Sequence, residues 1–233
     1  MQAILRIFFH LLYHQFAFAY DFVAATVSFG RWKDWILEAA PFIEGTRVLE
    51  LGHGPGHLQR TLLDRGLIAV GLDESPQMTR LAKHNTDGAA HLARGLAQYL
   101  PFAGSTFDTV VATFPAEYIF DPVTLTEANR VIKETGRFVV LPGAMITGQG
   151  AWDRFLSWLF RITRQTPPNL SEIVHERSKK PFAEAGFRVE THELKVKSSL
   201  VFIMTATKTT SRGMEQCKDE ARQKRNADAQ KIT

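Results

Sequence analysis

Three glycines and one aspartate are the residues of this sequence whose spacing points most directly to chemistry. Gly52, Gly54 and Gly56 follow the apolar run 47–51. Glycine adopts backbone angles that other residues avoid, and it lets a ligand lie against the main chain. Asp73 ends the next apolar run, 17 residues after Gly56, where a carboxylate can accept hydrogen bonds from both hydroxyls of a ribose. The spacing predicts a site for a ligand that contains a nucleoside.

The glycine spacing also separates the classes of nucleotide ligand. The dinucleotide fingerprint places its third glycine three positions after the second, and here that position is His57. NAD and FAD are disfavoured for this reason. No Gly-Lys-Ser/Thr sequence follows the turn, which excludes a phosphate-binding P-loop.

The segment 48–57 resembles the first motif of class I S-adenosylmethionine (SAM)-dependent methyltransferases, an acid followed by x-G-x-G-x-G, with Glu50 as the acid. The resemblance spans about residues 45–207, and further matches follow in order along the chain. They are the ribose-binding acid and following helix at 73–78, the G-D-A-x-x-L-P-F…S-F-D stretch at 95–108, and the E-x-x-R-V-L-K-P-G-G-R segment at 127–137. The resemblance implies SAM as cofactor, S-adenosylhomocysteine as product, and no metal.

The same resemblance assigns the cofactor-binding residues. In the family the acid at Glu50 supports the glycine turn and the methionine amino group. The aspartate expected to bind the adenine amino group falls on Leu96, so adenine would depend on the backbone near Ala97 and on apolar packing. The lost hydrogen bond costs about 0.5–1.5 kcal/mol, which weakens binding without abolishing it. The implied residues are Tyr20, Glu50, Leu51, Gly52, Gly54, Gly56, Asp73, Glu74, Met78, Leu96, Ala97 and Phe114.

Short β-rich runs alternate with helical patterns after residue 46, which predicts parallel strands joined by right-handed crossovers. Two consecutive strands near the C-terminal end have no helix between them and predict an antiparallel hairpin. The predicted strands are 47–51, 68–72, 89–93, 107–113, 137–141, 187–194 and 200–207, and the predicted helices are 57–65, 76–84 and 125–133. We therefore expect an α/β fold, a doubly wound, seven-stranded, mostly parallel Rossmann-like sheet with a C-terminal hairpin.

Three regions follow from this pattern. Residues 1–44 form N-terminal amphipathic helices, and residues 45–207 form the SAM-binding domain with an inserted lid helix at 151–164. Residues 208–233 are almost devoid of apolar side chains, which predicts a disordered polar tail. The tail holds seven Lys/Arg and four Asp/Glu, so it supplies +3 of the net charge of +4. The nearly neutral remainder argues against a nucleic-acid partner.

The single cysteine, Cys217, excludes an intramolecular disulfide framework and fits a reducing compartment. We therefore expect a cytoplasmic protein. Residues 17–19, Ala-Phe-Ala, imitate a signal-peptidase site, but an amphipathic helix accounts better for the first 20 residues.

Methyl transfer from a sulfonium needs alignment and exclusion of water, and it needs a general base only if the nucleophile must lose a proton. Polar side chains at the carboxyl ends of the predicted strands are the candidates for that role. His53, Glu117 and Tyr118 are the predicted catalytic residues, and His57 and Asp121 are weaker candidates. Each also has an ordinary structural explanation, as a turn, helix-start or core residue.

Two amphipathic segments suggest the acceptor. The N-terminal helix (1–20) leads into a Y-D…S-x-G…W pattern that begins at Tyr20 and resembles quinone-biosynthesis C-methyltransferases and bacterial phospholipid N-methyltransferases. In those enzymes the tyrosine covers bound SAM. The segment 152–164 predicts a helix with tryptophan and phenylalanine on one face and arginine on the other. This composition is typical of a lid helix or of a helix that lies in a membrane interface. The segment 113–118 is not the Asn/Asp-Pro-Pro-Tyr/Phe box of nucleobase methyltransferases.

The sequence thus predicts methyl transfer from SAM to a small lipophilic acceptor of quinone, phenol or lipid type. Peripheral membrane contact through 1–20 and 152–164 remains an option beside the lid. The alternative function is a non-catalytic SAM-binding sensor or scaffold, which the absent adenine aspartate motivates. The sequence predicts neither the methylated atom nor the oligomeric state.

Overall fold

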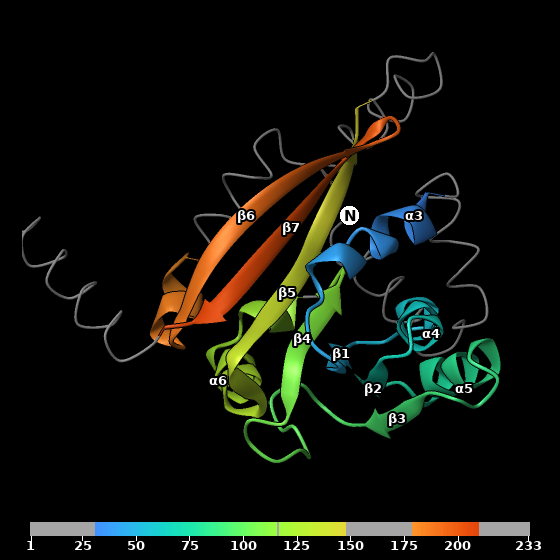
Figure 1. The fold of residues 1–233 in the computed structure, drawn as a ribbon, viewed down its shortest axis with the longest axis horizontal. Coiled ribbons are helices and arrows are strands. Elements are labelled where there is room, and N and C mark those ends of the chain that lie inside the picture. The colour runs from blue at the N-terminus through green and yellow to red at the C-terminus, as the bar shows by residue number, and fades with distance from the viewer. Residues whose placement is uncertain (1–30, 116, 148–178, 210–233) are drawn as a thin grey trace, which may run out of the picture.

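The computed structural model describes residues 31–115, 117–147 and 179–209. Seven strands in these segments form one sheet (Figure 1). The strands are β1 (Arg47–Leu51), β2 (Ile68–Asp73), β3 (His91–Arg94), β4 (Phe107–Thr113), β5 (Ile132–Ile146), β6 (Phe187–Val196) and β7 (Ser199–Lys208). The helices are α3 (Trp32–Leu37), η2 (Ala40–Phe42), α4 (His57–Asp64), α5 (Pro76–Asn85), η3 (Glu117–Phe120) and α6 (Pro122–Val131).

The strand order is β3-β2-β1-β4-β5-β7-β6. Strands β1 to β5 are mutually parallel, and β7 is antiparallel to both β5 and β6. The chain therefore runs outward from β1 to β3 and returns to place β4 beside β1. This reversal is the point at which doubly wound sheets bind ligands, outside the carboxyl ends of their strands. The predicted fold class, including the C-terminal hairpin, is confirmed.

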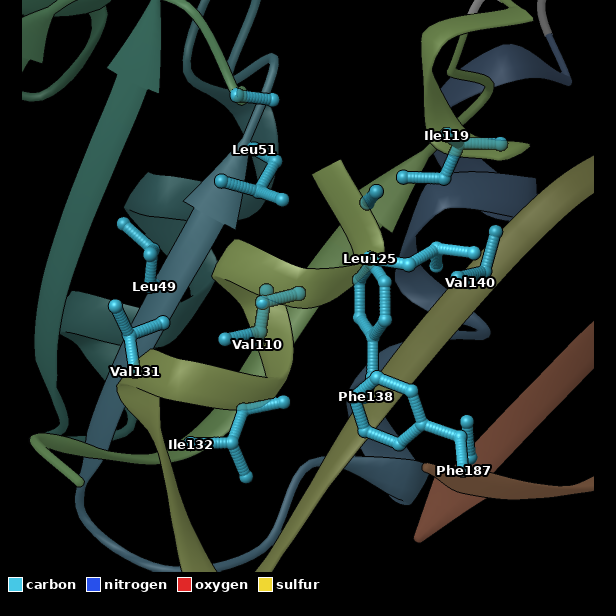
Figure 2. Close-up of a cluster of buried hydrophobic side chains, with 14 of the residues drawn as sticks. Leu49, Leu51, Val110, Ile119, Leu125, Val131, Ile132, Phe138, Val140 and Phe187 are labelled. Carbon is cyan, nitrogen blue, oxygen red and sulfur yellow. The ribbon is translucent and has the colours of Figure 1, made fainter. Parts of the chain in front are cut away.

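Two clusters of buried apolar side chains cover opposite faces of the sheet. One lies under α6 and the helical residues 179–184, and Figure 2 shows part of it. The other lies under α3 and α4, and α5 packs beside α4 on that face. Alternation along β1 assigns Leu49 and Leu51 to the α6 face and Val48 to the α4 face. The side chain of Glu50 consequently points toward α4.

Two helix starts show how local chemistry sets the boundaries. The hydroxyl of Ser75 accepts a hydrogen bond from Met78 N at 3.3 Å at the start of α5, and Pro76 takes the first helical position, both as predicted. Helix α6 begins at Pro122, earlier than the predicted residue 125. Asp121 explains the difference, because its carboxylate accepts from Val123 N at 3.0 Å and caps the helix.

Strand β5 is much longer than the predicted 137–141. It begins directly after α6, and its second half pairs with β7 through residues 143–146. Figure 1 shows β5, β7 and β6 extending together beyond the other strands. A long-range antiparallel partner extends a strand past the segment that its own sequence marks as β-rich.

The predicted N-terminal helix, the whole inserted segment 151–164 and nearly all of the predicted polar tail lie outside the described residues. No helix in the described part of the chain is long and apolar enough to cross a membrane. Lid or membrane contact by 1–20 and 152–164 stays a prediction.

Candidate cofactor site

The glycine turn, residues 52–56, connects β1 to α4 through three left-handed backbone positions. The φ angles of Gly52, Gly54 and Gly56 are +70°, +50° and +85°. Only glycine adopts such angles without strain. The N–H of Gly52 donates to Leu72 O at 2.8 Å, which ties the start of the turn to the end of β2.

The three glycines meet different surroundings. A Cβ atom at Gly56 would lie 2.9 Å from the Cβ of Ala82 on α5, so this glycine permits the close approach of α4 and α5. A Cβ at Gly52 would lie 2.7 Å from the hydroxyl of Tyr118. Around Gly54 no atom lies within 4 Å of the corresponding position. The middle of the turn therefore borders open space that a side chain would fill, as a cofactor site requires.

Asp73 is oriented by the backbone on both sides. Its Oδ2 accepts a hydrogen bond from Gly54 N at 3.0 Å, and its Oδ1 accepts one from Ser75 N at 2.8 Å. An ionised carboxylate has about four acceptor positions, so two stay available for ribose hydroxyls. The structure thus brings the predicted ribose-binding acid into direct contact with the glycine turn.

Glu50 lies beneath the turn with 1% of its surface exposed. Its Oε2 accepts a hydrogen bond from Nε2 of Gln59, on α4, at 2.8 Å. Burial raises the pKa of Glu50 to about 8; the Gln59 hydrogen bond opposes this shift, and the nearby charge of Asp73 adds to it. Glu50 therefore belongs to the buried support of the turn.

His53 also lies beneath the turn, with 3% of its surface exposed. Its Nδ1 is 2.8 Å from Gly54 O, and its ring fills the space that a side chain at Gly71 would need. Burial lowers its pKa, against the influence of Asp73 and backbone hydrogen bonds. A general base must reach a proton on the acceptor, so this placement does not favour the predicted catalytic role.

The segment after β4 brings aromatic side chains to the same edge of the sheet. Phe114 has a φ of +47°, which is an outlier for a bulky residue, and its N–H donates to Leu141 O at 2.7 Å. Its ring centroid lies 4.0 Å from that of Trp32 and 6.1 Å from that of Trp35. We call Phe114, Trp32 and Trp35 the aromatic cluster.

Tyr118 and Glu117, the other predicted catalytic residues, lie in η3. The Tyr118 hydroxyl donates to Leu51 O at 3.4 Å beside Gly52. Its position at the turn is compatible with a role in the site, whereas only the backbone of Glu117 is described. Both catalytic assignments stay predictions.

Of the remaining predicted cofactor-binding residues, two are exposed to solvent and two are buried. Leu96 is 47% exposed beyond the end of β3, and Glu74 is exposed beside Asp73. Ala97 and Met78 are buried, so their side chains support the site from below. Tyr20 lies outside the described residues.

Gln59 and Gly71 were not identified from the sequence, and Trp32 and Trp35 were noted only as part of the Y-D…S-x-G…W pattern. Gln59 shares the buried side of α4 with Leu58 and Leu62, and a polar residue on an apolar helix face is a usable signal. A glycine inside a strand, such as Gly71, likewise signals close packing. In the described segments, no three His, Cys, Asp or Glu side chains gather as metal ligands.

A shallow groove lies away from the turn, between the segment after β3 and the start of α6. Its lining residues are Gln98, Tyr99, Leu100, Pro122, Val123, Thr126 and Glu127. None of these belongs to the glycine turn or to the aromatic cluster.

Comparison with known proteins agrees with this geometry. A family described as "Methyltransferase domain" matches residues 49–140. The chain is 30% identical over 159 residues to a demethylmenaquinone methyltransferase of Thermobifida fusca, covering 65% of this chain and 67% of the relative. It is 27% identical over 190 residues to an uncharacterized methyltransferase, YrrT, of Bacillus subtilis, covering 76% and 85%.

Solved structures agree at the level of the fold. A complex between the Haloferax volcanii Trm112 methyltransferase activator and a putative methyltransferase superposes with a TM-score of 0.57 at 19% identity, covering 83% of this chain and 98% of that one.

Proposed function

The chain belongs to the class I SAM-dependent methyltransferases, and we propose that it methylates a small lipophilic acceptor of quinone, phenol or lipid type. SAM, when bound, supplies an electrophilic methyl group on a sulfonium. The residues described above fit such a cofactor, because Gly54 leaves room against the backbone and Asp73 retains acceptor positions for ribose hydroxyls.

The protein's own contribution is chiefly alignment. Asp73 would hold the ribose hydroxyls, and the backbone of the glycine turn would lie against the cofactor. Methyl transfer is an in-line displacement whose barrier falls when the reacting atoms are held at near-attack distance and water is excluded. A turn whose backbone is fixed by hydrogen bonds from Gly52 N to Leu72 O and from Gly54 N to Asp73 is suited to that task.

The aromatic cluster is the observation that supports a lipophilic acceptor. It follows β4, the strand beside β1, and so lies at the point where the chain reverses across the sheet. Phe114 keeps a left-handed backbone there. Such strain costs on the order of 1–3 kcal/mol and gathers at functional sites. An apolar, aromatic surface beside the methyl donor favours flat, lipophilic acceptors over charged ones.

The names of relatives support the same substrate class. The Thermobifida fusca relative is named for demethylmenaquinone, and a Geotalea uraniireducens relative is named a ubiquinone/menaquinone biosynthesis C-methyltransferase. The latter is 29% identical over 134 residues, 52% of this chain and 57% of the relative.

The test is transfer of a radiolabelled methyl group from SAM to a panel of reduced quinones, phenols and amino lipids, with hydrophilic acceptors beside them. We expect turnover with the lipophilic acceptors, and a KM for them that rises about tenfold in Phe114→Ala, the fold-change equivalent to about 1.4 kcal/mol of lost contact. Phe102→Ala is the matched control, because Phe102 packs on Phe107 at the opposite end of β4. Turnover confined to hydrophilic acceptors would refute the acceptor class.

We also propose peripheral membrane contact through residues 1–20 and 152–164, with no nucleic-acid partner. An amphipathic helix with arginine opposite tryptophan and phenylalanine binds anionic interfaces. Sedimentation with anionic vesicles tests this, with zwitterionic vesicles as control. If the protein stays in the supernatant with both, the membrane contact is rejected and the acceptor proposal is unaffected.

A further inference from the structure

Glu50 and Gln59 form a buried pair whose hydrogen bonds are incomplete. Gln59 Nε2 donates to Glu50 Oε2 at 2.8 Å and lies 3.4 Å from Val70 O. Gln59 is fully buried, yet its Oε1 has no hydrogen-bond partner among the described residues. A buried acceptor without a donor costs about 1–3 kcal/mol. A protonated Glu50 carboxyl has an O–H group that could donate to Gln59 Oε1, whereas an ionised carboxylate has no donor.

The charges around Glu50 do not supply a counter-ion. Its register partners on β2 and β4 are Gly71 and Val111, which carry no charge. Gln59 faces it from α4, and the titratable groups of the nearby turn are Asp73 and His53. Within the described segments, no cationic side chain pairs with Glu50. A carboxylate buried without a cation favours its neutral form, which carries an O–H donor.

We propose that Glu50, held in place by Gln59 as a positioning residue, is a neutral carboxylic acid in the cofactor-free protein because it is buried without a cation, and that binding of the cationic cofactor at the glycine turn expels this proton to solvent. The inference rests on cofactor binding at this turn. Glu50 lies two residues before Gly52, the first residue of the turn, and the charge of Asp73 raises its pKa. A cation bound on the turn would therefore also be close enough to shift the pKa of Glu50. A nearby positive charge favours the ionised acid.

The consequence is a cofactor affinity that depends on pH. When binding requires the ionised acid, the apparent affinity rises as pH rises toward the pKa of Glu50 and levels off above it. For a pKa of about 8, the Kd for SAM falls about 50-fold between pH 6 and pH 8.

The test is calorimetric titration of SAM into the full-length protein at pH 7, in phosphate and in Tris. The two buffers have different ionisation enthalpies, so the difference between the observed enthalpies counts the protons released. We expect the wild type to release about 0.9 proton more than Glu50→Gln. The variant keeps an N–H donor toward Gln59 and cannot ionise, while the cofactor's own amino group contributes equally to both proteins. Glu190→Gln, on exposed β6, is the matched control and should release the wild-type number.

Gln59→Met tests the positioning residue itself. It removes the amide that favours the ionised acid, so the pH at which the SAM affinity levels off should move upward; a merely space-filling role for Gln59 would leave that pH unchanged. If the variant does not fold, carbon-13 NMR of the labelled wild type tests the same point, because the Glu50 carboxyl signal should titrate near pH 8 and lose this titration with SAM.

Three outcomes are distinguishable. Proton release that is lost in Glu50→Gln supports the inference. Equal release by the wild type and Glu50→Gln overturns it and leaves the methyltransferase assignment intact. Failure of the wild type to bind SAM at any pH overturns the cofactor site itself.

Discussion

The α6 face and the α4 face of the sheet bury different side chains close to β1. Under α6 lies a large cluster of leucine, valine, isoleucine and phenylalanine side chains (Figure 2). Under α4 and the glycine turn, the same strand and its neighbours bury Glu50, His53 and Gln59. Buried polar groups cost free energy unless they are fully paired, and both His53 Nε2 and Gln59 Oε1 are without partners in the described structure.

The difference indicates a division of labour. The α6 face is packed chiefly by apolar side chains, whereas the α4 face combines its own apolar cluster with polar groups that reduce stability beside the glycine turn. Sites that bind and orient a ligand commonly keep such groups at the expense of stability. The variants below test this division, from the largest expected effect to the smallest.

Leu125→Ala should remove stability without affecting the cofactor. Leu125 is fully buried on α6, and truncation of such a side chain typically lowers the free energy of unfolding by about 2–5 kcal/mol. Denaturant unfolding measures the loss, and calorimetry should find the SAM affinity within about twofold of the wild type. A large loss of affinity would contradict the division between the faces.

Asp73→Ala should do the reverse. The variant loses the carboxylate proposed to bind the ribose and the acceptor for two backbone N–H groups of the site, so the SAM affinity should fall about 100-fold. Equilibrium dialysis with labelled SAM measures it. Asp64→Ala, on the exposed side of α4, is the matched control and should bind normally. An unchanged affinity of Asp73→Ala would remove the assigned ribose site.

Gly54→Ala and Gly56→Ala form a pair that separates binding from folding. Both place alanine at positive φ, which costs about 1–2 kcal/mol, but only Gly56→Ala also forces a Cβ against Ala82. We expect both variants to lose SAM binding and Gly56→Ala to unfold at the lower temperature. If Gly54→Ala binds SAM as the wild type does, the open space at Gly54 is not part of the site.

Glu50 should make stability depend on pH. Burial raises its pKa from 4.5 to about 8, so the folded protein binds more protons than the unfolded chain between these values. The stabilising contribution of the neutral acid is therefore fully present below about pH 4.5 and is lost as pH rises through about 8. Relative to Glu50→Gln, the Tm of the cofactor-free wild type should fall by roughly 4 °C between pH 7 and pH 8.5. A constant Tm difference between the two proteins would show that Glu50 is not neutral at low pH.

Local signals made most of the fold predictable. Ser75 and Pro76 mark the start of α5 by capping and fixed φ, and the strand β4 coincides with the predicted run 107–113. The glycine turn and Asp73 were also identified correctly as neighbours, because parallel strands end at one edge of the sheet. Asp121 was interpreted as a candidate for catalysis or a turn, whereas it caps α6.

Long-range pairing explains the rest. The second half of β5 is a strand because β7 lies against it, which no local propensity expresses. The role of Gln59 depends on its contact with Glu50 across the space between α4 and β1. The burial of His53 depends on a missing side chain at Gly71 on another strand. The sequence identified the glycine turn and Asp73 more readily than the buried residues packed beneath them.

A crystal structure with S-adenosylhomocysteine tests the central claim most directly. The account predicts the ribose hydroxyls on the carboxylate of Asp73 and the ligand lying over Gly54, on the side of the turn away from Glu50 and His53. Well-defined ligand elsewhere, for example in the groove beside Tyr99 and Val123, with nothing at Asp73, would contradict it.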